Sequence, residues 1–323
     1  MADYKTILNS IHITEDDYFS LSQEMQDEID YSLLQSERFD ALLIKAPVKI
    51  DITKRKTFPI LKIIQNDGIR EWQIEESRNL IVSAYNVQTG HLIAKTARKD
   101  IKRMVYPPKT IDKGPIPENM SKTSYSTGTE LIDIKPSIGI PWIPSQYRVT
   151  LICFDWVSNS VDVDLYEENN QTKMRYNISQ LNNTKVNAIL SLKKDSGKGE
   201  VTFSIPEKCT ANPEKFTIQG KFIVPVNDCN ISEIDKKSVV IPAWIMIVEK
   251  NIDQGSAILA KWFITADLQE KISEQVLAEG TFKFTLPELL PEITQKPLTP
   301  NNYCCYIVVN GNVFGPEKCN ITN

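Results

Sequence analysis

The chain has 323 residues, of which 41% are hydrophobic and 24% charged, with a formal net charge of -4 and a pI near 5.5. This balance is typical of a globular protein and excludes a disordered chain. The slight acidity, with lysines spread along the sequence, excludes binding to nucleic acid by general basic charge. The length suits two domains, each able to bury its own core.

The N-terminal segment, residues 1–37, carries the clearest helical pattern. Thr14 is a suitable N-cap, and three acidic residues follow it where the helix dipole favours negative charge. Apolar residues then recur every three or four positions, which gives one hydrophobic stripe. Its members are Tyr18, Leu21, Met25, Ile29 and Leu33. We predict a helix over residues 14–37 that packs on the protein's own core; the alternative is a helix that docks onto a partner.

From residue 38 the hydrophobic period changes to two, which is typical of strands. The stretches Leu80–Tyr85 and His91–Ala94 flank a turn that contains Gly90, so they predict a hairpin. Near the C-terminus, Asn310-Gly311 is a strong signal for a two-residue hairpin turn.

Residues 147–165 predict a further hairpin with one apolar and one polar face. On one face the apolar residues alternate along both strands: Val149, Leu151 and Cys153, then Val161, Val163 and Leu165. The opposite face is polar apart from Ile152, so we expect it to lie toward solvent. Its polar members are Arg148, Thr150, Asp162 and Asp164.

Three sequence cues occur in the same order in both halves of the chain. In the first half they are Gly90–Lys95, Gly128–Lys135 and Tyr147–Phe154; in the second they are Gly255–Lys261, Gly280–Pro287 and Tyr303–Val309. Two copies of one β-rich unit explain this order better than chance. We therefore predict an all-β protein of two tandem antiparallel, immunoglobulin-like β-sandwich modules at residues 38–168 and 169–323, preceded by the N-terminal α-helix.

Residues suited to catalysis are scarce. The chain has two histidines, His12 and His91, and neither is near a nucleophile motif. It has no Gly-x-Ser-x-Gly elbow, phosphate-binding glycine loop or His-Glu-x-x-His sequence. We therefore assign no catalytic residue, expect no cofactor, and favour a protein that is not an enzyme.

The six cysteines are unevenly placed, with one in the first half and five in the second. Modules of this size do not depend on a disulfide framework, so we expect reduced, mostly buried thiols. The N-terminus has no apolar stretch followed by a small-residue cleavage site. We expect a cytoplasmic protein, or one exported by a route without a cleavable signal peptide.

Acidic residues gather around the 147–165 hairpin and are the candidate metal ligands: Asp155, Asp162 and Asp164. Carboxylates on loops of this kind can bind calcium. The alternative is that alternating acids on a strand simply form its solvated face. No EF-hand or other defined series of ligands is present.

The loop Ile138–Pro144 is the candidate binding site, with Ile140, Trp142 and Ile143 as its contact residues. It is apolar and places a tryptophan between prolines, and such rigid aromatic loops lose little entropy on contact. Its counterpart in the second half, Pro287–Ile293, carries charge and no tryptophan. The alternative is that Trp142 folds over the end of its own module or fills the seam between the modules.

The function most consistent with these features is a non-enzymatic binding or structural protein that contacts a protein or glycan through its loops. One alternative is a toxin or effector that acts on membranes or host proteins, since the apolar Trp142 loop leaves membrane contact open. A second alternative is a hydrolase with a carboxylate or calcium-assisted site near Asp155, Asp162 and Asp164. The sequence does not indicate an oligomeric state.

Overall fold

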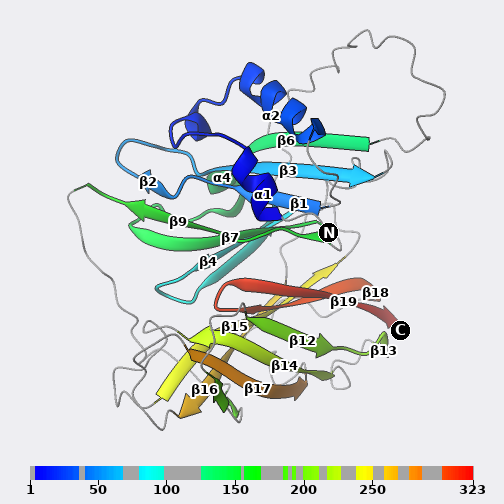
Figure 1. The fold of residues 1–323 in the computed structure, drawn as a ribbon. Helices are drawn as coiled ribbons and strands as arrows, with labels where there is room; N and C mark the ends of the chain where they lie inside the picture. Colours follow the sequence, from blue (N-terminus) through cyan, green and yellow to red (C-terminus); the bar gives the residue numbers. More distant parts are fainter. Residues whose placement is uncertain are drawn as a thin grey trace, which may run out of the picture.

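The computed structural model describes residues 4–35, 41–67, 80–97, 125–153, 156–168, 185–187, 191–193, 199–210, 217–226, 238–249, 258–267, 276–285 and 300–322. Strands in several, mainly antiparallel, sheets dominate, and helices are few, so the predicted all-β class is confirmed (Figure 1). No helix within these ranges is both long enough and apolar enough to cross a membrane.

The first half forms two sheets. One has the order β1-β3-β6, from β1 (Ala41–Lys45), β3 (Pro59–Asp67) and β6 (Tyr125–Asp133). The other has the order β2-β9-β7-β4-β5, with β8 (Trp156–Val157) paired to β7. Its strands are β2 (Lys49–Asp51), β4 (Ile81–Asn86), β5 (Leu92–Thr96), β7 (Ser145–Cys153) and β9 (Val161–Tyr166).

These two sheets share one hydrophobic core. Leu42, Ile44 and Ile60 from the first sheet belong to the same buried cluster as Val149 and Leu151 from the second. Burying these side chains is the main favourable contribution to folding of this half. The alternation predicted for Val149, Leu151, Cys153, Val163 and Leu165 is confirmed, since all five are in this cluster.

The second half also forms two sheets. One has the order β10-β16-β15-β18-β19-β13 and the other the order β11-β17-β14-β12. The strands of the first are β10 (Lys185–Asn187), β13 (Lys208–Thr210), β15 (Ser238–Glu249), β16 (Ile258–Asp267), β18 (Asn301–Val309) and β19 (Asn312–Thr322). Those of the second are β11 (Ser191–Lys193), β12 (Glu200–Ser204), β14 (Thr217–Val226) and β17 (Val276–Thr285).

The two halves pair their strands in a common order. The order β1-β3-β6 corresponds to β12-β14-β17, and β2-β9-β7-β4-β5 corresponds to β13-β19-β18-β15-β16. In each half the short edge strand is parallel to its neighbour, β2 to β9 and β13 to β19. That these are repeated immunoglobulin-like sandwich modules, with the boundaries given above, stays a prediction.

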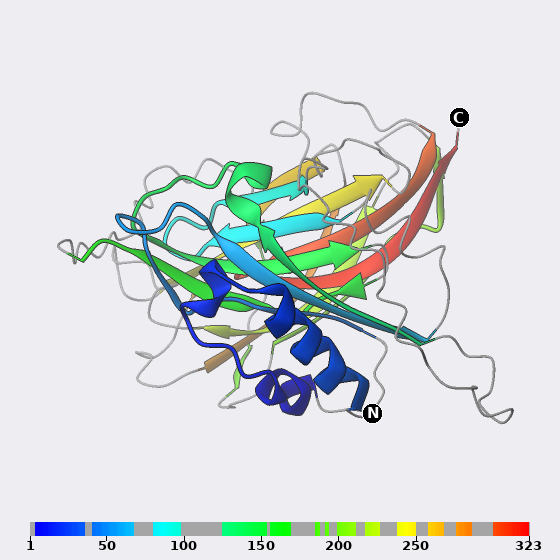
Figure 2. The ribbon, with the colours of Figure 1, turned by 90° about the horizontal axis from the view of Figure 1, so that it is seen from above.

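Helices cover the outer face of the β1-β3-β6 sheet (Figures 1 and 2). They are α1 (Tyr4–Ser10), the 3-10 helix η1 (Asp17–Phe19) and α2 (Gln23–Gln35). Their buried side chains form one cluster with the sheet: Ile7, Ile11, Tyr18, Ile29 and Leu33 with Leu43, Leu61 and Ile63. The interpretation of this segment as a layer on the protein's own core agrees with this packing.

The predicted start of the helix at Thr14 is wrong. The amide and hydroxyl of Thr14 both donate to Asp17 Oδ2 over 2.7 Å, which closes a turn ahead of η1. The helix α2 begins only at Gln23, where the Met25 amide donates to Ser22 Oγ. The acidic run after Thr14 therefore forms a capped turn rather than the first turn of a longer helix.

The prediction that the polar face of the 147–165 hairpin lies toward solvent holds for the exposed Asp162 but is wrong for the part of the face around Thr150. Thr150 and Ile152 on this face are buried, and Arg148 Nη1 donates to Asn310 O of the second half over 3.1 Å. A buried cluster joins the halves here: Ile81, Tyr85, Leu92, Ala94 and Ile152 with Trp244, Met246, Cys304, Tyr306 and Val308. The second half covers this face of the first (Figure 1).

Candidate functional site

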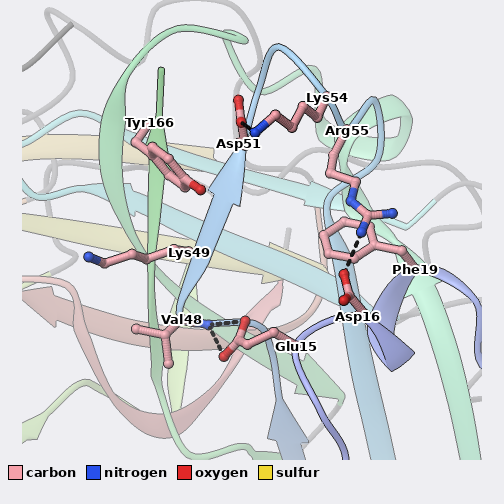
Figure 3. Close-up of a pocket in the computed structure, with 9 residues that line it drawn as sticks. All are labelled: Glu15, Asp16, Phe19, Val48, Lys49, Asp51, Lys54, Arg55 and Tyr166. Carbon is pink, nitrogen blue, oxygen red and sulfur yellow. Dashed lines mark hydrogen bonds and ion pairs between the residues drawn. The ribbon is translucent and has the colours of Figure 1, made fainter. Parts of the chain in front are cut away.

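A pocket of about 400 Å³ lies between the N-terminal segment and the edge strand β2 (Figure 3). Its volume is in the range of sites for small molecules. The residues that line it are mostly charged or aromatic: Glu15, Asp16, Phe19, Val48, Lys49, Asp51, Lys54, Arg55 and Tyr166. The sequence pattern had not singled out this set.

The position of β2 follows from its pairing with β9 and from the burial of Ile50 in the core. The amide of Asp164 donates to Val48 O over 2.9 Å, and the amide of Ile52 donates to Tyr166 O over 3.0 Å. These backbone bonds place Tyr166 beside the strand that forms the pocket. In Figure 3, Lys49 and Tyr166 lie on one side of β2, and Phe19 and Arg55 lie on the other.

The turn after β2 is organised by Asp51. Asp51 Oδ1 accepts hydrogen bonds from the amide and the hydroxyl of Thr53, over 3.0 and 2.6 Å. Its carbonyl accepts from the amides of Lys54 and Arg55. The side-chain hydrogen bond from Thr53 is the main reason that the pKa of Asp51 is lowered, and Lys54 adds to the effect. Asp51 is therefore held as a carboxylate that shapes the turn.

The wall opposite β2 comes from the N-terminal segment. The Glu15 carboxylate accepts from the Val48 amide over 3.1 and 3.2 Å. Arg55 Nη2 pairs with Asp16 Oδ1 over 2.5 Å, and the Arg55 guanidinium lies 4.3 Å from the centre of the Phe19 ring. Arg55 thus combines an ion pair with a cation–π contact, and both hold its planar head group in place.

The polar groups of the remaining pocket residues differ in whether they have hydrogen-bond or ion-pair partners. Lys54 Nζ bridges Glu168 and Asp51 over 2.8 and 3.2 Å, and these contacts raise its pKa, Glu168 most. The part of the chain that the structure describes offers no partner to the Lys49 ammonium or the Tyr166 hydroxyl. These two groups are available to a ligand.

The Trp142 loop lies next to this pocket and supports it. It follows the short helix α4 (Ile134–Ile138). Trp142 Nε1 donates to Ile52 O over 3.2 Å, and Lys135 Nζ lies 3.9 Å from the centre of the Trp142 ring. The Lys135 ammonium also donates to Lys56 O over 2.9 Å. Two side chains of this region therefore hold the turn that forms one end of the pocket.

The three predicted contact residues of this loop differ in exposure. Ile140 is buried in the core of the first half, Trp142 is half-buried against it, and Ile143 is 49% exposed. The contacts described for Trp142 are with its own half. That the three residues form an interface with a partner stays a prediction, and the counterpart loop Pro287–Ile293 lies outside the described residues.

The predicted metal ligands are not brought together by what the structure describes. Both carboxylate oxygens of Asp162 bind the Arg148 guanidinium, over 2.7 and 2.8 Å. Asp164 is a half-buried residue of β9, and Asp155 lies outside the described residues. Within the described ranges no group of three or more His, Cys, Asp and Glu side chains is arranged to hold a metal ion. Calcium binding by Asp155 with its neighbours stays a prediction.

The pocket was missed because its residues come from three separate stretches of sequence. The pattern of residues 14–19 predicts the start of a helix, and the alternation in Val48–Ile52 predicts a strand. A local signal for the turn was present, since an aspartate two residues before a threonine favours a side-chain-capped turn. The approach of the N-terminal segment to this turn has no comparable signal.

No family model matches the chain, and no curated protein matches it. Among solved structures, it is similar over 39% of its length to the alkylpurine DNA glycosylase AlkC of Pseudomonas fluorescens, with 10% identity and a TM-score of 0.24. It is similar over 40% of its length to a β-glucosidase of Listeria innocua, with 13% identity and a TM-score of 0.25. The matches cover 31% and 17% of those two chains.

The structure of the chicken interferon gamma receptor alpha chain aligns with more of the chain, covering 88% of this chain and 98% of the receptor chain. Its identity is 10% and its TM-score is 0.15. At such TM-scores these likenesses define neither a fold family nor a function, so the function is argued from the pocket itself.

Proposed function

We propose that the chain is a tandem pair of immunoglobulin-like β-sandwich modules. The strand orders support this, since each half has a smaller sheet, of three strands in the first half and four in the second, and a larger sheet in which a short edge strand runs parallel to the last strand of the module. The shared order in both halves supports duplication of one module. Superposing the β1-β3-β6 and β12-β14-β17 sheets in an experimental structure tests it, because a duplication requires the remaining strands to coincide as well.

We propose further that the protein is a non-enzymatic binding protein whose contact site is the pocket beside β2. The observation that carries this proposal is the ordering of the pocket's charged groups before any ligand arrives. Asp51 is buried and held by Thr53, and Lys54 and Arg55 each pair with an exposed acid, so part of the side-chain entropy is already lost before binding. Lys49 and Tyr166 remain to contact the ligand.

The composition of the pocket supports binding over catalysis. Among the residues that the structure describes, its lining has no serine, threonine, cysteine or histidine, which are common nucleophiles and proton carriers. The pKa of Asp51 is held below its ordinary value, chiefly by the hydrogen bond from Thr53. A carboxyl that acts as a general acid at neutral pH needs a raised pKa instead.

The test is to screen the full chain against protein and glycan arrays and to repeat the measurement with Lys49→Glu and Tyr166→Ala. Binding that both variants lose supports the site. The matched control is Tyr31→Ala, because Tyr31 is a 66% exposed tyrosine on α2, outside the pocket. Binding that neither pocket variant changes would overturn the site, and turnover of a bound ligand would overturn the non-enzymatic assignment.

A further inference from the structure

The charges around the pocket balance. Of the residues that the structure describes, three acids and three bases line it: Glu15, Asp16 and Asp51 against Lys49, Lys54 and Arg55. An anion in the pocket meets three carboxylates, and a cation meets three basic groups. Neither sign of ligand charge therefore gains the net attraction that a site lined by one sign of charge provides.

The same groups include both hydrogen-bond donors and acceptors, and they lie on both sides of β2 (Figure 3). The Arg55 guanidinium has five N–H donors, and its described ion pair engages one nitrogen. Each Glu15 oxygen accepts from the Val48 amide and retains further acceptor capacity. The Tyr166 hydroxyl can donate and accept. A phosphate only accepts hydrogen bonds and an ammonium group only donates them. Either ligand therefore uses only a part of the pocket's donors and acceptors.

We propose that the pocket binds a neutral glycan. Sugar hydroxyls both donate and accept, so an oligosaccharide that crosses β2 can meet the Lys49 donor on one side and the Arg55 donors on the other, with Glu15 as acceptor. The Tyr166 ring offers an apolar face with a polar tip, which suits a sugar ring that carries C–H groups on its faces. This inference rests on the proposed binding function and adds the class of ligand.

The experiment applies the folded full-length chain to an array of neutral oligosaccharides and their sialylated and sulfated counterparts, followed by titration with the retained sugars. We expect neutral sugars to be retained. Their affinity should fall about ten-fold in Tyr166→Ala, because this variant loses one aromatic contact and one hydrogen bond. Tyr31→Ala should bind as the native chain does. Lys49→Ala, at an exposed position, provides a second pocket variant should Tyr166→Ala fail to fold.

Each other outcome overturns a defined part of the inference. If the chain prefers sialylated or sulfated sugars and the pocket variants lose this binding, the ligand is not a neutral glycan, but the binding site stands. A protein ligand that the pocket variants lose, with no sugar retained, overturns the glycan and leaves the proposed function. Sugar binding unchanged in both pocket variants overturns the pocket itself. If no ligand binds in a way that depends on Lys49 or Tyr166, both proposals are overturned.

Discussion

At the residue scale, Asp30 of α2 is a carboxyl group in an unfavourable environment. The Thr129 hydroxyl of β6 donates to Asp30 Oδ1 over 2.7 Å. Burial raises the pKa of Asp30 to about 6, from an ordinary value of 3.8, and the Asp27 carboxylate adds to the rise while the Thr129 hydrogen bonds oppose it. The folded state therefore binds the proton more tightly than the unfolded state does.

The sign of the resulting pH dependence follows from linkage. Stability from this group is fully present below the unfolded pKa and is lost as the pH rises through the folded pKa near 6. We expect Asp30→Asn, which keeps the acceptor for Thr129, to be more stable than the native chain at pH 7.5, by on the order of 1 kcal/mol. The gain should shrink at pH 4.5. Urea unfolding of both chains at the two pH values measures this.

The exposed Glu28 on the same helix gives the matched control, Glu28→Gln, which should show little difference from the native chain at either pH. A stability gain for Asp30→Asn that is equal at pH 7.5 and 4.5 would show that ionisation of Asp30 is not its cause.

The buried thiols give a second prediction at this scale. The thiols of Cys153, Cys304, Cys305 and Cys319 are buried and form no disulfide, which agrees for these four with the expected reduced state. Burial raises the pKa of the Cys305 thiol, with smaller contributions from Cys319, Cys304 and Glu317. Since the thiolate is the reactive form, these thiols should be inert in the folded chain.

The measurement uses a Cys209→Ala, Cys229→Ala chain, because the side chains of these two residues are not among those described. We expect no labelling by a thiol reagent at pH 8 in the folded state, and labelling of all four remaining cysteines in guanidinium chloride. Rapid labelling of the folded chain would contradict the burial.

At the scale of elements, both short turns predicted from sequence are present. Gly90 has φ 63° between β4 and β5, and Asn310 and Gly311 have φ 48° and 78° between β18 and β19. Positive φ at both Asn310 and Gly311 is what a two-residue type I′ turn between strands requires. The sequence patterns predict these two turns correctly because the turns depend on local backbone sterics alone. The contacts these turns make with the other half of the chain have no such local signal.

Gly311 is constrained by packing as well as by its backbone. A Cβ at this position would lie 2.7 Å from the Tyr85 ring and 3.1 Å from Arg148 Cδ, both in the first half. We expect Gly311→Ala to destabilise the chain by about 1–3 kcal/mol, from strain at positive φ and displacement of these side chains. Gly128→Ala is the control, because a Cβ there meets nothing within 4 Å. Equal melting temperatures for the two variants would contradict this role of the turn.

At the scale of the whole molecule, continuous apolar runs in the sequence indicate that the halves stack. Ala243–Ile247 and Tyr303–Val309 are apolar throughout and buried at every position, and Ile81–Asn86 is buried at every position although it includes the polar Ser83 and Asn86. Strands covered on one face alternate between apolar and polar residues, whereas strands covered on both faces are mostly apolar along their whole length. Such runs reveal that both faces are covered, but they do not say by which element. The partner for each face is set by contacts between distant parts of the chain, and the same limitation hid the pocket beside β2.

The cluster between the halves predicts that they stay together when the chain is cut. Besides apolar side chains, the Trp244 indole donates to Gly90 O over 2.9 Å in a buried position. A protease site inserted between residues 168 and 185 allows cleavage of the folded chain. We expect the cut protein to elute as one species in size-exclusion chromatography, because separation would expose the apolar residues of both halves to water.

Ile152→Asp places an unpaired charge in this buried cluster, so the cut variant should dissociate into two fragments. Ile143→Asp changes an isoleucine that is 49% exposed, and the cut fragments should remain together. Two fragments from the cut native chain would show that the halves are joined mainly by the covalent linker. A single species from the cut Ile152→Asp chain would show that polar contacts, such as Arg148 with Asn310 O, hold the halves together without this cluster.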